Sequence, residues 1–258
     1  MKVNFDAIGS KDYQEEVLRR TGKKLMPFER VWDASCPKVW SKWETNGHEW
    51  VVQDLEVGDF ENVVNILLEE MYSDEVLCSL SNLREDADSV VGLKKFWAAC
   101  LAQRMSLGLY TWVNGVKTLA AVNVCVASAA GENFPDIEVE GAAWKNVYLA
   151  VEYIENKQDP HQYTGLDTML HAFGLLVKRQ FRGSKLGERL LSAREPLCRF
   201  NGIKGTATVF TGPASQKVAT LAGFQEICEA TLKELAESGL KYPSDENRSI
   251  KLMIKLYE

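Results

Sequence analysis

The second half of the chain alternates between two spacings of hydrophobic residues. Predicted strands fall at 171–177, 205–210, 224–230 and 249–256, and the first of them ends in the apolar run Leu175 to Val177. Apolar residues three and four positions apart, which share one face of a helix, fall at 184–199 and 213–222. A strand, a helix and a further strand in this order predict one parallel β-α-β crossover over 171–210. Pro196 should kink or shorten the last turn of the first of these helices.

The first half of the chain predicts an antiparallel part of the same sheet. The predicted strands lie at 49–57, 108–113 and 117–128, and the predicted helices at 60–71, 90–106 and 142–156. Asn114-Gly115 stands between two of these strands and is a strong signal for a hairpin. Asp59 is placed to cap the first helix. The fold class is therefore α/β, of the α+β type, with a central mixed sheet flanked by helices.

The first 47 residues differ from the rest of the chain. They are polar, show no clear period and carry Trp32, Trp40 and Trp43. We expect residues 1–47 to be an N-terminal extension that packs on the domain through these rings. Residues 48–258 are then expected to form the functional domain, which is long enough to bury a substantial core.

Composition and charge narrow the classes of function. The chain has 258 residues, of which 46% are hydrophobic and 26% charged, as is ordinary for a globular protein. Its net charge of −6 argues against nucleic acid as a partner, because duplex binding normally needs a basic face. No apolar run approaches the roughly 20 residues needed to cross a bilayer. The six cysteines are scattered without a CxxC pair, which predicts free thiols in a reducing compartment. We expect a cytoplasmic monomer or weak dimer without a membrane partner.

The turn after Val177 combines glycine with positive charge. Arg179, Arg182 and Lys185 stand around Gly183, just before the helix begins. The first N–H groups of a helix lack intrahelical partners and attract anions. The glycines alone would also suit an ordinary strand-to-helix turn. The three basic residues, in a chain with net negative charge, favour a phosphate-binding site instead. Neither GxxxxGK[ST] nor GxGxxG is present, so we expect a phosphate-bearing cofactor other than the nucleotides that those motifs bind.

At this turn the sequence resembles the GCN5-related N-acetyltransferase (GNAT) superfamily. The segment 175–187 is similar to its central signature, an apolar-x-Val strand end followed by [RQ]-x-x-G-x-[GA], with Lys185 in place of the first motif glycine. Segments 71–80 and 209–224 are similar to those of its insect arylalkylamine N-acetyltransferase-like branch. The resemblance covers roughly residues 49–256. It implies a GNAT-like acyltransferase fold and an acetyl-CoA-dependent N-acetyltransferase without a metal.

The resemblance also implies which residues bind acetyl-CoA. The pyrophosphate would lie on the amides of residues 182–187, the pantetheine arm along the strand end, and a backbone N–H near Leu175 would face the thioester oxygen. The residues so assigned are Leu175, Leu176, Val177, Arg182, Gly183, Ser184, Lys185, Leu186, Gly187 and Ser215.

Three side chains match the catalytic positions that the resemblance implies. Glu75 matches the base that takes a proton from the attacking amine, and Thr211 and Ser215 match two hydroxyls beside the cofactor, of which Ser215 is the preferred acid. Each has a plain structural alternative, since carboxylates and hydroxyls near helix ends usually cap them. His171 is expected to reach the cleft or to serve as a packing residue.

The acceptor is left open by these residues. The resemblance favours a small primary amine, an arylalkylamine such as dopamine, serotonin or tyramine, attacked directly in a ternary complex. The alternatives are a polyamine, agmatine or amino-acid acceptor, a longer acyl-CoA, or a non-catalytic acyl-CoA-binding protein. Aromatic residues such as Phe96, Trp97 and Trp144 suit either an aromatic amine pocket or the core.

Overall fold

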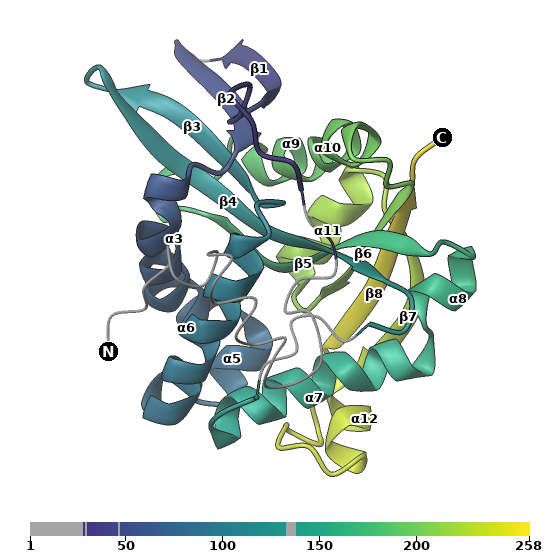
Figure 1. The fold of residues 1–258 in the computed structure, drawn as a ribbon. Coiled ribbons are helices and arrows are strands. Elements are labelled where there is room, and N and C mark those ends of the chain that lie inside the picture. Colours follow the sequence, from purple (N-terminus) through teal and green to yellow (C-terminus); the bar gives the residue numbers. More distant parts are fainter. Residues whose placement is uncertain (1–27, 29, 46, 133–137) are drawn as a thin grey trace, which may run out of the picture.

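A computed structural model of the chain describes residues 28, 30–45, 47–132 and 138–258. Its eight-stranded mixed sheet has the order β1-β2-β3-β4-β5-β6-β8-β7 (Figure 1). The strands are β1 (Val39–Thr45), β2 (His48–Asp54), β3 (Leu107–Val113), β4 (Val116–Ala129), β5 (Thr168–Val177), β6 (Gly205–Phe210), β7 (Gln225–Thr231) and β8 (Ser249–Leu256). The predicted mixed sheet flanked by helices is confirmed.

Helices lie at each of the five ranges that the hydrophobic spacing predicts. The α-helices are α3 (Phe60–Ile66), α4 (Tyr72–Asp74), α5 (Val76–Leu80), α6 (Ala87–Ala102), α7 (Ala142–Lys157), α8 (Pro160–Thr164), α9 (Leu186–Ser192), α10 (Arg194–Phe200), α11 (Pro213–Leu221) and α12 (Leu232–Glu237). The helices α5, α8 and α12 lie outside the predicted ranges. A π-helical segment, η2 (Leu67–Met71), joins α3 to α4, and short 3-10 turns occur at η1 (Val57–Asp59), η3 (Leu83–Glu85) and η4 (Arg179–Phe181). None of the helices in the described part of the chain is long and apolar enough to span a membrane.

Alternation along β4 divides the core between two layers of helices. Val122, Val124 and Val126 pack in one cluster with α3, α6 and the start of α7. Cys125 and Ala127 point to the other face, against α9 and α10. Figure 1 shows these two groups of helices on either side of the sheet. Because both faces are covered, β4 is buried along most of its length.

Two turn predictions are confirmed by the pairing of the strands. Asn114 and Gly115 both adopt positive φ, 51° and 78°, in the tight turn between the antiparallel strands β3 and β4. β5 and β6 run parallel, as the predicted crossover requires.

The segment predicted as an extension contributes a strand to this sheet. β1 pairs with β2 as an antiparallel hairpin, and the boundary predicted between residues 47 and 48 falls at the turn of that hairpin. Trp43 stacks on Trp50 with ring centroids 6.4 Å apart. Residues 1–27 lie outside the described part of the chain, so the packing of the extension as a whole stays a prediction.

Two details of the helix predictions are wrong. Asp59 makes no capping bond to α3, because its carboxylate accepts the hydroxyl proton of Tyr110 at 2.7 Å. The helix predicted over 184–199 is two helices that meet at Ala193, one turn earlier than the kink expected from Pro196. Pro196 instead lies in the first turn of α10, where its missing N–H costs little.

Two irregularities of β5 prepare the site. First, β5 and β6 share a single register pair, Leu170 with Thr206, so the two strands diverge beyond it. Second, the pairing with β4 slips between Asn123 and Cys125, where one residue of β4 faces Phe173 and Gly174. A gap between parallel strands beside a bulge leaves main-chain groups of β5 without a ladder partner.

Candidate active site

A cavity of about 1150 Å³ follows the divergence of β5 from β6. Its walls come from β5, β6, the turn before α9, the starts of α5 and α11, and one face of α7. The residues proposed from sequence that line it are Glu75, Leu175, Leu176, Val177, Arg182, Gly183, Lys185, Gly187, Thr211 and Ser215. Ser184 is exposed and Leu186 is buried in the core, so neither side chain belongs to the cavity wall.

The turn before α9 takes its shape from two residues with positive φ. Gly183 has φ 89° and open space where a Cβ would stand. Lys185 has φ 56°, a left-handed conformation that costs a residue with a side chain about 1 kcal/mol. Gly187 serves a different purpose, because a Cβ there would come within 3.3 Å of Val218 on α11. Lys185 thus replaces the glycine of the motif at a position whose left-handed backbone favours glycine.

The arginines of the turn are already paired with carboxylates. Arg182 donates from Nη2 to Asp74 at 2.8 Å and from Nε to the Val177 carbonyl at 2.9 Å. Arg179 donates from Nη2 to Asp74 at 2.9 Å. Hydrogen bonds from Arg179 and then Arg182 hold the pKa of Asp74 below its usual value. Lys185 is exposed and has no carboxylate partner in the described part of the chain, so its charge stays uncompensated.

The main chain of β5 offers hydrogen-bonding groups to the cavity. The Lys178 N–H donates to Ala120 on β4 at 3.0 Å. Since successive residues of a strand point to opposite sides, the main-chain groups of Leu175 and Val177 face away from β4, toward the gap. The bond from Arg182 to the Val177 carbonyl agrees with this direction. The Leu175 N–H therefore faces the cavity, as expected from sequence.

Glu75 combines the two roles that the sequence leaves open. Its carboxylate caps α5, accepting from the N–H groups of Leu77 at 3.0 Å and Cys78 at 2.6 Å. The same side chain lines the cavity. Two N–H donors fix the orientation of this carboxylate, so its remaining acceptor positions can bind a donor in the cavity.

The two predicted hydroxyls differ in their hydrogen bonding. Ser215 lies in the first turn of α11 and donates to the Gly212 carbonyl at 2.9 Å. The Thr211 hydroxyl has no hydrogen-bond partner among the described residues. Thr211 can therefore donate to a bound group directly, whereas Ser215 must first release Gly212.

The far half of the cavity is aromatic. Phe96 packs edge-on against Trp144 and Phe173, with centroid distances of 4.8 and 5.1 Å. These rings belong to the core and also to the cavity wall. The indole N–H of Trp144 is buried without a hydrogen-bond partner among the described residues.

Glu155 and His171, two titratable groups with shifted pKa values, also line the cavity. Desolvation and the carboxylates of Asp159 and Glu152 raise the pKa of Glu155 to about 7. Desolvation lowers the pKa of His171 to about 3, so its ring is neutral at pH 7. His171 Nε2 is buried without a hydrogen-bond partner among the described residues, and the His161 ring lies 5.5 Å away between centroids. His171 reaches the cleft, as one of its two predicted roles required.

Sequence reasoning did not find Glu155, although a signal was present. Trp144, Val147, Tyr148 and Val151 mark one face of α7 at helical spacing, and Glu155 continues it. A carboxylate on the inward face of a helix indicates a cavity or a partner. Among the described residues, no cluster of three or more His, Cys, Asp or Glu side chains is arranged to hold a metal ion.

Solved structures with the same fold are insect acetyltransferases. A yellow fever mosquito (Aedes aegypti) protein with the provisional name arylalkylamine N-acetyltransferase 7 is 28% identical, with a TM-score of 0.83 over 90% of this chain and 100% of its own. Arylalkylamine N-acetyltransferase 2 of Aedes aegypti is 19% identical, with a TM-score of 0.70 over 81% of this chain and 99% of its own. No protein-family model matches the sequence, and no curated protein matches it.

The chain has the GCN5-related N-acetyltransferase fold. The resemblance found in its sequence is thereby confirmed. A third similar structure is that of the Drosophila melanogaster polyamine N-acetyltransferase, which forms N-acetylagmatine. It is 18% identical, with a TM-score of 0.64 over 80% of this chain and 99% of its own. The GNAT fold thus accompanies different amine acceptors, and the acceptor must be argued from the cavity.

Proposed function

We propose that the chain is an acyl-CoA-dependent N-acetyltransferase that acetylates a small primary amine by direct attack in a ternary complex. The observation that carries this proposal is the gap between β5 and β6, where the Leu175 N–H faces a large cavity that begins at a basic turn. The similarity to the mosquito protein over 90% of the chain supports the same function. The free thiols of all six cysteines support a reducing, cytoplasmic location.

The residues present fit acetyl-CoA as cosubstrate. Arg182, Gly183 and Lys185 would hold its pyrophosphate at the turn, and the unpaired main-chain groups of β5 would hold its pantetheine arm. The cosubstrate supplies a thioester, whose carbonyl oxygen gains negative charge when an amine attacks it. The Leu175 N–H is the donor aimed at that charge.

Two proton transfers accompany the reaction, one from the attacking amine and one to the departing sulfur, and different side chains serve each. Glu75 accepts the proton that the ammonium group of the acceptor must lose, directly or through water. Thr211 or Ser215 donates a proton or a hydrogen bond to the departing sulfur. Thr211 is free to do so in the present arrangement, and Ser215 becomes free when it leaves the Gly212 carbonyl.

The aromatic half of the cavity favours an arylalkylamine such as dopamine, serotonin or tyramine as acceptor. The rings of Phe96, Trp144 and Phe173 line the cavity and can pack against the ring of such an amine. Glu155 favours a second candidate, an acceptor with a distal positive charge such as a polyamine or agmatine. Its carboxylate has no cationic partner among the described residues, and a bound cation would lower its pKa.

Two measurements test this function. Isothermal titration with acetyl-CoA tests whether the chain binds the cosubstrate. Absence of binding at millimolar acetyl-CoA would contradict the proposal. A panel of arylalkylamines, polyamines, agmatine and amino acids, followed by release of free thiol, identifies the acceptor. Binding without thiol release for any amine would support the non-catalytic alternative.

A further inference from the structure

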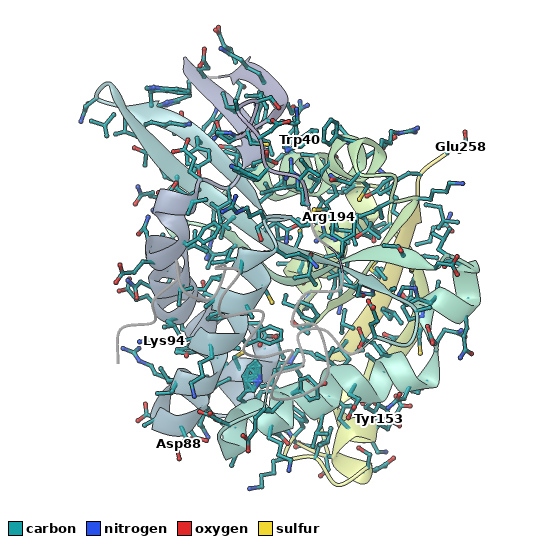
Figure 2. The ribbon with its side chains drawn as sticks, in the orientation of Figure 1. Trp40, Asp88, Lys94, Tyr153, Arg194 and Glu258 are labelled. Carbon is teal, nitrogen blue, oxygen red and sulfur yellow. The ribbon has the colours of Figure 1, made fainter. Side chains whose placement is uncertain are left out.

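A fully buried arginine lies beneath the bulge of β5. Arg194, labelled near the middle of the molecule in Figure 2, has no exposed surface and no carboxylate partner within the described part of the chain. Its Nε donates to Asn123 Oδ1 on β4 at 2.8 Å. Its Nη1 donates to Thr206 at 3.1 Å and to Thr208 at 2.9 Å, both on β6. Arg194 therefore joins β4 to β6 across the gap where β5 and β6 diverge.

The partners of Arg194 are oriented to receive its protons. Thr206 donates its own hydroxyl proton to Leu170 O at 2.6 Å, and Thr208 donates to Ala207 O at 2.7 Å. Asn123 donates from Nδ2 to the Gly174 carbonyl at 2.8 Å, which leaves its Oδ1 free to accept from Arg194. Each partner thus presents an oxygen lone pair to the guanidinium.

The bond from Asn123 fixes one peptide group of the bulge. Gly174 lacks a regular ladder partner because the pairing of β4 and β5 slips at this point. In a trans peptide the C=O of Gly174 and the N–H of Leu175 point in opposite directions. Holding the Gly174 oxygen toward β4 therefore turns the Leu175 N–H toward the cavity. Without this bond the peptide plane could rotate and take the N–H away from the cavity.

We propose that Asn123 and Arg194 are positioning residues, which hold the Leu175 N–H as the donor to the acyl carbonyl of the cosubstrate. Arg194 also places an uncompensated positive charge beneath the bulge, and this charge strengthens Asn123 as a donor. A buried cation without an anionic partner normally destabilises a fold. The positioning role accounts for the presence of Arg194 despite this cost. The inference rests on the proposed function and adds two residues to it that act through the Leu175 N–H.

The variant Asn123→Asp tests the proposal with little change of shape. Aspartate still accepts from Arg194, but it cannot donate to the Gly174 carbonyl and it neutralises the buried charge. We expect kcat to fall about 10²-fold while the KM for acetyl-CoA stays within about threefold, since a donor to the developing charge is misplaced. Asn123→Ser, which is too short to bridge Arg194 and Gly174, should show the same loss if the aspartate variant does not fold.

Gln103→Glu is the matched control. Gln103 is buried, donates to Ala127 O at 2.8 Å and so clamps the same strand away from the bulge. The change removes that donor and adds a carboxylate, as in the Asn123 variant. We expect it to lower stability and to leave kcat within about twofold of the unmodified chain.

A spectroscopic measurement separates positioning from general damage. Infrared difference spectra with acetyl-CoA labelled with ¹³C at the carbonyl report the hydrogen bond to the bound thioester. We expect the carbonyl band to shift to lower frequency on binding to the unmodified chain and to move back toward its free position in Asn123→Asp. An unshifted band in the unmodified chain, or a shift and kcat that survive Asn123→Asp, would overturn the inference. Failure of the unmodified chain to bind acetyl-CoA would overturn the proposed function instead.

Discussion

Arg182 and Asp74 form an ion pair of 2.8 Å between residues 108 positions apart, and this pair stands at the entrance of the cavity. The arginine is the first residue of the motif proposed to bind pyrophosphate, so cosubstrate binding competes with the carboxylate for it. Because the pair is partly exposed, its net strength is small.

Asp74→Asn should therefore tighten acetyl-CoA binding. Removing the carboxylate weakens the hold on Arg182 and Arg179, although Glu70 stays 3.6 Å from Arg182, and a surface pair of up to about 1 kcal/mol corresponds to a gain of up to about fivefold in Kd. Titration calorimetry at two salt concentrations measures the Kd for acetyl-CoA. Glu69→Gln, which removes an exposed charge without an ion-pair partner among the described residues, should leave Kd unchanged. Weaker binding in Asp74→Asn would mean that the ion pair organises the turn for the ligand.

Lys185→Gly and Lys185→Ala should differ in stability although both remove the same charge. Lys185 has φ 56°, which glycine adopts freely and alanine does not. The glycine variant should therefore be more stable than the alanine variant by about 1 kcal/mol in urea unfolding. Both should show a smaller salt dependence of acetyl-CoA binding than the unmodified chain. Equal unfolding free energies would show that the backbone of the turn relaxes around alanine.

Glu75→Gln should lower activity far more than its lost capping bond explains. An amide satisfies one of the two N–H groups that the carboxylate binds, so the loss of stability should be about 1 kcal/mol. The loss of a general base should lower kcat about 10²-fold or more at saturating acetyl-CoA.

The capping residue Asp86 provides the control for Glu75. It accepts from the Ala143 N–H and the Ser89 hydroxyl, which lower its pKa to about 2, and it lies outside the cavity wall. Asp86→Asn should therefore reduce stability at neutral pH and leave kcat unchanged. Equal losses of kcat in Asp86→Asn and Glu75→Gln would remove the assignment of Glu75 as base.

Glu155→Gln should stabilise the chain in a pH-dependent way. The pKa of Glu155 is about 7 when folded and about 4.3 when unfolded, so its charge destabilises the fold increasingly as the pH rises between these values. The variant should gain up to about 4 kcal/mol at pH 8, since each pKa unit corresponds to about 1.4 kcal/mol, and nothing at pH 4, measured by urea unfolding at both pH values. A gain of equal size at both pH values would point to packing as its cause. Reduced acetylation of agmatine with unchanged acetylation of tyramine would in addition support Glu155 as the site of a distal cation.

The features of this protein that depend on neighbouring residues could be predicted from the order of those residues alone. The apolar run over 117–128 predicts a strand, and Asn114-Gly115 before it supplies the positive φ values of a tight hairpin. The motif around Arg182 predicts a turn at the cavity, because its glycines and charges lie within a few residues of one another.

Ion pairs and hydrogen bonds between side chains that are distant in sequence became visible only in the folded chain. Asn123 is a polar residue within an apolar strand, and Arg194 is a charged residue four positions after Leu190 on the apolar face of a helix. Each interrupts the hydrophobic spacing of its element. Their hydrogen bond, however, could not be predicted from that spacing. The pairing of Arg182 with Asp74 and the raised pKa of Glu155 likewise depend on packing between separate elements. Hydrophobic periodicity determines which face of an element is buried. The partner that it meets depends on how the helices and the diverging strands pack together.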